Sequence, residues 1–178
     1  MDAGFPADAV AAARDAVKAH IRAAGDAEDE LVAAQAVSAL SLCEAFTGRA
    51  AIVREHVEWV RGDSAWRRLA VAPVVAIIAV EAVAEDGAAS ALAADRFAVD
   101  IDANGDGWVR AAADGVRVRV TCSAGLAADW AGLPAPLAQG VVLLAAHLLG
   151  GATSEPPAAV TALWRPWRRM RLNGERAA

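Results

Sequence analysis

Apolar residues recur with a helical period towards both ends of the chain and with a strand period between them. From Ala7 to Ala24 and from Leu31 to Phe46, they fall three or four residues apart, which predicts two amphipathic helices. An acidic run precedes Leu31, and negative side chains stabilise the positive end of a helix dipole. Gly48 follows as the expected C-terminal cap of the second helix.

A helix that is apolar on nearly every side is predicted between Pro134 and Gly150, with Gln139 and His147 as its only polar side chains. The uninterrupted apolar stretch is far shorter than the ~20 residues that a membrane span needs. We therefore expect this helix to be buried in the protein. A last helix should begin after Pro156 and be ended or kinked by Pro166.

The middle of the chain is rich in β-branched residues and has turn signals between its apolar runs. The Asp114-Gly115 pair predicts a tight hairpin turn before the last run, in which valines alternate with Arg117, Arg119 and Thr121. Strands are expected at residues 52–59, 74–83, 97–101, 108–111 and 116–122.

The pattern as a whole predicts an α+β fold in a single domain, residues 1–178. It would be a helical bundle of two N-terminal and two C-terminal helices, at about 7–47 and 134–172, with a strand-rich insert at about 50–122.

Charge and cysteine content indicate which partners and which cellular compartment to expect. Residues 160–178 hold five arginines against Glu175 alone, a net charge of +4, so the rest of the chain carries −9 of the total −5. An acidic body with a basic tail suggests an acidic partner for the tail, although a merely solvated terminus accounts for the charge equally well. Cys43 and Cys122 are isolated thiols, and no signal peptide is recognisable at the N-terminus, so we expect a soluble protein made in a reducing cytoplasm.

Candidate chemistry is sparse. Residues 100–107 match the first half of a calcium-binding loop, but the position of the last ligand is Ala111, and the Asn-Gly and Asp-Gly pairs favour a hairpin turn. His20, His56 and His147 are scattered, and no nucleophile, phosphate-binding or dinucleotide motif occurs. We predict no metal, no cofactor and no enzymatic activity.

The C-terminal segment around Trp164 and Trp167 carries two tryptophans among arginines. Such side chains bury aromatic area and pair with carboxylates or phosphates, and both types dominate interface hot spots. The alternative is a terminal helix that packs its tryptophans onto its own domain and leaves its arginines in solvent. Composition alone favours this alternative.

Three stretches, taken in order, resemble the head–tail connector (adaptor) proteins of long-tailed phages and of phage-derived gene transfer agents. The first ends the second helix at residues 44–49, the second runs from Leu133 into the apolar helix to Leu148, and the third begins at Pro156. The chain departs from the family after Leu148, where Leu149-Gly150-Gly151 replaces a polar end, and the middle strands carry no matching motif.

The resemblance implies a structural part of the particle neck in a phage or gene transfer agent, made in the bacterial cytoplasm. Copies would form a ring, twelve-fold as in the family, under the portal protein and above the next tail or stopper component. DNA would only pass through its channel, and no membrane would be involved. The implied portal contacts are Trp164, Arg165, Pro166, Trp167, Arg168, Arg169, Arg171 and Leu172.

Two other hypotheses remain open at this point. One is a small α+β enzyme or ligand-binding domain whose pocket is assembled from distant segments, which would show a cleft with convergent polar groups. The other is a nucleic-acid binder that uses the arginine tail, whose affinity would fall steeply with salt.

Overall fold

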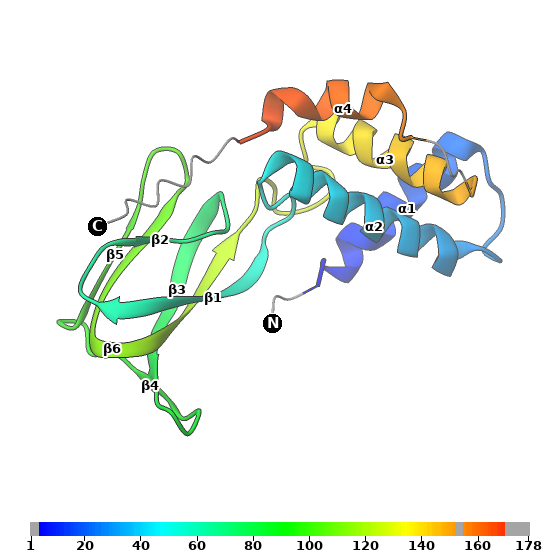
Figure 1. Cartoon of the computed structure of the whole chain (residues 1–178). Coiled ribbons are helices and arrows are strands. Elements are labelled where there is room, and N and C mark those ends of the chain that lie inside the picture. The colour runs from blue at the N-terminus through cyan, green and yellow to red at the C-terminus, as the bar shows by residue number, and fades with distance from the viewer. Residues whose placement is uncertain (1–3, 152–154, 170–178) are drawn as a thin grey trace.

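The computed structural model describes residues 4–151 and 155–169. Helices gather at one end of the molecule and strands at the other (Figure 1), in the α+β order that the sequence predicts. The helices are α1 (Ala7–Ile21), α2 (Asp29–Thr47), α3 (Ala135–Leu149) and α4 (Ala158–Trp164), followed by a 3-10 turn, η1 (Arg165–Trp167). The strands are β1 (Arg54–Asp63), β2 (Arg67–Arg68), β3 (Val74–Val83), β4 (Ala89–Ala91), β5 (Phe97–Ile101) and β6 (Gly107–Ala124). Among the described helices, none is long and apolar enough to cross a membrane.

The helical region is built around close contacts between small side chains. α2 packs against α1 and α3, and α3 packs against α4. Ala13 of α1 and Ala36 and Ala39 of α2 are fully buried, so that the helix backbones can approach one another. α3 supplies the larger core residues Leu137 and Val141, as expected for the apolar helix.

The strand region is organised around β6, which pairs antiparallel with β2 and β5 through its first half and with β1 and β3 through its second half. The predicted alternation is confirmed from Arg117 onwards: Val118 and Val120 are fully buried in a second core, whereas Arg117 is exposed on the opposite face. Val116, which the pattern also placed on the buried face, is 39% exposed. β4 extends the sheet only at the end of β3, along Glu81–Val83.

The predicted hairpin at Asp114-Gly115 is wrong. β6 runs through these residues as one 18-residue strand, in which Gly115 adopts a φ of +83°. The register with β1 shifts nearby, between Arg61 and Asp63. The Asp-Gly pair therefore supplies the positive φ of an irregular strand at which β6 changes partners, and the chain does not reverse.

The last helix is shorter than predicted. α4 ends at Trp164, Pro166 lies in the 3-10 turn, and Arg168 is extended, so the chain leaves the helix well before residue 172. Proline cannot donate a backbone N–H to continue the helix, as the sequence pattern anticipates for this position. Residues 170–172 of the predicted helix lie outside the described residues.

The two regions meet where the chain leaves α2. The Glu44 carboxylate, in the last turn of α2, pairs with both terminal nitrogens of Arg54 at 2.7 Å and accepts the Ala51 N–H at 2.7 Å. The segment between them crosses Gly125 so closely that a Cβ there would lie 2.3 Å from the Val53 nitrogen. Only glycine leaves room for this crossing.

Candidate functional site

The predicted contact segment begins with a tryptophan that is buried. Trp164 is 3% exposed, and its Nε1–H donates to the Leu137 carbonyl at 3.2 Å. Its ring also lies 5.9 Å from that of Phe46, centroid to centroid. This is the arrangement that the alternative of a self-packed terminal helix expects for Trp164.

A glycine in α3 makes room for this indole. A Cβ at Gly140 would lie 2.1 Å from Trp164 Nε1. Glycine within a helix is unfavourable by roughly 0.5–1 kcal/mol relative to alanine. At this position the cost is offset, because the absence of a side chain lets Trp164 pack against α3. Trp164 therefore anchors α4 on α3. Because it is buried within its own subunit, we do not propose it as a partner contact.

Arg169 is also engaged within the chain. Its guanidinium forms an ion pair with Asp106, which is buried in the turn before β6, and its backbone N–H donates to the Thr47 carbonyl at 2.7 Å. The Trp167 carbonyl accepts a hydrogen bond from Arg49 Nε at 3.2 Å. The end of the described chain is thus tied to both the helical and the strand regions.

The remaining residues of the segment lie at the surface. Arg165, Pro166 and Arg168 are exposed, and Trp167 is half-buried against the helical core. The Arg168 guanidinium carbon stands 5.6 Å from the centre of the Phe46 ring. Arg171 and Leu172 lie outside the described residues. The predicted segment therefore divides into internal anchors and a small exposed edge, which we call the Arg165–Arg168 edge (Arg165, Pro166 and Arg168).

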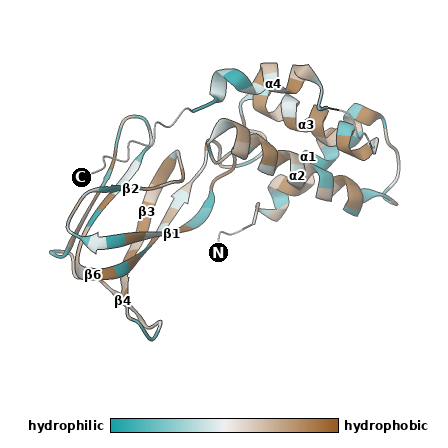
Figure 2. Cartoon of the chain, viewed as in Figure 1, coloured by the Kyte–Doolittle hydropathy of each residue, from teal (hydrophilic) through white to brown (hydrophobic). Residues whose placement is uncertain are grey.

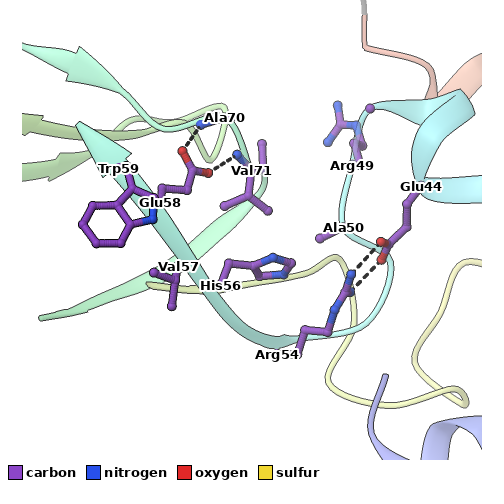
Figure 3. A pocket seen from close by; sticks show the side chains of 12 residues that line it. Glu44, Arg49, Ala50, Arg54, His56, Val57, Glu58, Trp59, Ala70 and Val71 are labelled. Atoms are coloured by element: carbon purple, nitrogen blue, oxygen red, sulfur yellow. Dashed lines mark hydrogen bonds and ion pairs between the residues drawn. The ribbon is translucent and has the colours of Figure 1, made fainter. Parts of the chain in front are cut away.

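A cavity of about 530 Å³ lies beside the junction of the two regions, and Figure 3 shows the residues that line it. Its two carboxylates are both engaged: Glu44 pairs with Arg54, and Glu58 accepts the backbone N–H groups of Ala70 and Val71, each at 2.6 Å. Acid–base chemistry would require one of these groups to leave the contact that holds the backbone. The arrangement serves to fix β1 against its neighbouring loops.

The turn that resembles a calcium loop is a hairpin between β5 and β6, as predicted. Asp102 Oδ1 accepts the N–H groups of Asn104 and Asp106, and Oδ2 accepts the Trp108 indole N–H. These hydrogen bonds, that of Asp106 above all, lower the pKa of the Asp102 carboxyl. Within the described residues, no three His, Cys, Asp or Glu side chains are grouped so that they could hold a metal ion.

No protein-family model matches the sequence. No curated protein matches it either. Solved structures do match, over the whole chain. A chain from the neck of an empty gene transfer agent (GTA) particle, computed with C6 symmetry, has a TM-score of 0.78 and 27% sequence identity, covering 99% of this chain and 100% of that chain. Chains from a native GTA virion and from the neck of a native GTA particle computed with C12 symmetry both have a TM-score of 0.72, at 27% and 26% identity, with the same coverage.

The predicted head–tail connector family is confirmed. The stretches that carry the connector resemblance lie where this fold is held together. Glu44 closes α2 and fixes the crossing to β1, Pro134 begins α3, and Pro157 begins α4, which carries Trp164.

Sequence reasoning missed the roles of three residues that hold Trp164, Arg169 and Trp167 in place. Gly140 was recognisable as a glycine inside an apolar helix, which is a sign of close packing. Asp106 was hidden in a pattern that is typical of any turn, and its partner Arg169 is 63 residues away. Arg49 ends the first stretch of the connector resemblance, but nothing in its local sequence indicates that it donates to the Trp167 carbonyl.

Proposed function

We propose that copies of this chain form a homo-oligomeric ring in the neck of a phage or gene transfer agent particle, beneath the portal protein. The ring joins the DNA-filled head to the next tail or stopper component and leaves a channel through which DNA passes. The role is structural and includes no catalytic step.

The observation that carries this proposal is the whole-chain match to chains from GTA necks, in which the helices and the strand-rich middle correspond together. Those necks were computed with C6 and C12 symmetry, which supports a ring of identical subunits. A match confined to the helices would have shown only a helical bundle. Because the match covers 99% of the chain, it includes the strand region as well as the helices.

We further propose that the Arg165–Arg168 edge contacts the portal. The backbone of this edge is held on one side by the buried Trp164 and on the other by the Arg169–Asp106 ion pair. Its two exposed guanidinium groups are therefore presented from a rigid platform, and little conformational entropy is lost on binding. Their charge suits an acidic surface on the partner.

Charge reversal tests this contact while leaving the buried anchors in place; within the chain it gives up the contact of the Arg168 guanidinium with the Phe46 ring. Arg165→Glu/Arg168→Glu changes only exposed side chains, whereas a truncation before Trp164 would also remove the buried anchor. Binding of the purified protein to portal rings is measured by co-sedimentation. We expect the double variant to raise Kd at least about tenfold, equivalent to about 1.4 kcal/mol.

The matched control is Arg22→Glu/Arg61→Glu, which makes the same change of charge at two exposed arginines elsewhere. We expect it to bind portal rings like the wild type. Unchanged binding by the Arg165→Glu/Arg168→Glu variant would rule out the Arg165–Arg168 edge as the docking surface. Absence of the wild-type chain from purified particles would overturn the proposed function itself.

A further inference from the structure

This inference rests on the proposed ring and concerns the surfaces through which neighbouring subunits meet. In a cyclic ring with more than two subunits, each subunit uses one surface towards the neighbour on one side and a different surface towards the other. The chain should therefore present two distinct surfaces that can be buried at low cost. Exposed aliphatic side chains without nearby charges mark such surfaces.

The first surface is the outward side of α2. It is formed by Leu31, Ala34, Ser38, Ser41, Leu42 and Ala45, which we call the α2 outer face. Leu31 is 51% exposed and Leu42 49%, and no ionisable carboxylate, amine or guanidinium occurs between Glu30 and Glu44. Figure 2 shows hydrophobic positions along this helix.

The polar groups of the α2 outer face are already satisfied. The Ser38 hydroxyl donates to the Ala34 carbonyl, and the Ser41 hydroxyl donates to the Val37 carbonyl, both at 2.9 Å. Burying a hydroxyl is costly mainly when it loses its hydrogen-bond partner. These two serines keep their partners inside the helix, so another subunit can cover them.

The second surface lies at the beginning of β3, where Val75 is 57% and Ile78 is 53% exposed. Both residues fall at irregularities in the pairing of β3 with β6, and we call Val75, Ala76 and Ile78 the β3 bulge face. β4 pairs only with the far end of β3, along Glu81–Val83. Bulges discourage the addition of another strand, so a partner should pack here through side chains.

The two surfaces match in character. The α2 outer face spans fifteen helical residues, roughly 22 Å, and the β3 bulge face spans four strand residues, roughly 13 Å, so the strand surface can be covered entirely by part of the helix surface. Neither carries a charged side chain that would have to be desolvated on contact. They belong to different regions of the fold (Figure 1), so one subunit can use both at once.

We propose that the α2 outer face of each subunit packs against the β3 bulge face of the next subunit in the ring. The contact is heterologous, because residues of α2 meet residues of β3 and not a second α2. A cysteine at one position should therefore meet a cysteine at a different position on the neighbour.

Cysteine cross-linking in assembled particles tests this arrangement. Cys43 and Cys122 are both buried, and burial raises the pKa of the Cys43 thiol to about 12, which keeps it protonated and unreactive near neutral pH. Particles containing Leu42→Cys/Ile78→Cys are treated with a short bismaleimide and analysed on denaturing gels. We expect a ladder of covalent multimers from the double variant and monomer alone from each single variant.

The control pair is Leu42→Cys/Val99→Cys, which keeps the helical position and moves the other thiol to an exposed residue of β5. It should give monomer alone. Monomer from Leu42→Cys/Ile78→Cys in particles that contain the chain would overturn this interface while leaving the neck assignment intact. Dimers from a single variant would overturn the heterologous contact.

A charge placed on the α2 outer face provides a second test that does not depend on cross-linking geometry. Leu42→Glu should reduce incorporation into particles at least about tenfold, with an unchanged circular dichroism spectrum, whereas Val99→Glu should be incorporated normally. Normal incorporation of Leu42→Glu would count against the proposed interface. Loss of its folded spectrum would show that Leu42 serves the subunit's own stability, and would also contradict the proposal.

Discussion

The helical region and the strand region bury their cores in different ways. The helical core brings together elements from both ends of the chain, with alanines at the helix contacts and one large side chain, Trp164, between α3 and α4. The strand core depends on β6, which pairs with every strand of the region except β4. The stability of the helical core therefore depends strongly on one side chain, and that of the strand core on one strand.

The links between the two regions are mostly polar. Glu44 holds Arg54 and the chain that follows α2, and Asp106 holds Arg169 at the end of the described chain. The two hydrophobic clusters share no buried residue. Each core can therefore be perturbed separately, and the links form a third target.

The largest expected effect is that of Trp164→Ala in the helical core. Removing a buried aromatic side chain leaves a cavity, and we expect a loss of about 3–5 kcal/mol in the free energy of unfolding. This free energy is measured by urea denaturation, monitored by circular dichroism. Trp66→Ala, at an exposed position in the strand region, is the control and should cost far less. A loss below about 1 kcal/mol for Trp164→Ala would contradict the anchoring role given to Trp164.

The corresponding change in the strand core is Leu69→Ala, at a residue that is 1% exposed. We expect a loss of about 2–3 kcal/mol, at the lower end of the range for buried leucines, because fewer atoms are removed than from the tryptophan. Far- and near-ultraviolet circular dichroism, recorded during urea denaturation, shows whether both regions unfold together. If each variant shifts only one of two transitions, the regions are separate cooperative units; one shared transition would show that the links couple them.

A smaller effect is expected from Asp106→Asn, which removes the charge that pairs with Arg169. Hydrogen bonds to charged groups contribute about 1.5–3 kcal/mol, and we expect a loss in that range. Asp95→Asn, at an exposed carboxylate of the same region, should have little effect. If Asp106→Asn is as stable as the wild type, the ion pair does not hold the C-terminal segment in place.

The smallest expected effect is a loss of stability at low pH. The hydrogen bond from Lys18 lowers the pKa of Asp29 at the start of α2, and backbone hydrogen bonds lower the pKa of Asp102 in the strand region. A carboxyl whose pKa is lower in the folded state contributes stability above its unfolded value, near 3.8, and loses that stability as the pH falls through its folded value. Both regions should therefore lose a little stability below about pH 4.

Thermal melts of the wild type, Asp29→Asn and Asp102→Asn at pH 3 and pH 6 test this point. Each variant should show a smaller difference in Tm between the two pH values than the wild type, because one of the titrating carboxyls is missing. A larger difference in either variant would contradict the direction given for that pKa.

The helices were more predictable than the long-range contacts because their signals are local. Gly48 was expected to cap α2, and it does so with a φ of +67°. The bounds of β3 and β5 agree with the predicted 74–83 and 97–101, since apolar runs and turn residues lie next to each other in sequence. The continuity of β6 was missed because it depends on which strands lie beside it, and a dipeptide carries no such information.

The C-terminal segment shows the same division. Its composition alone favoured a self-packed terminal helix, whereas the connector resemblance implied a contact surface, and neither says which side chains point inward. Gly140 decides the position of Trp164, and Asp106 decides that of Arg169, and both lie far away in sequence. What remains at the surface is the Arg165–Arg168 edge.

A cryo-electron microscopy reconstruction of the neck of the particle that contains this chain would be the most direct measurement. We predict a ring of copies in which the Arg165–Arg168 edge lies against the portal and the α2 outer face of each copy meets the β3 bulge face of the next. A ring whose copies touch the portal only through other surfaces, with Arg165 and Arg168 in solvent, would contradict the proposed attachment. A neck that lacks the chain altogether would contradict the proposed function.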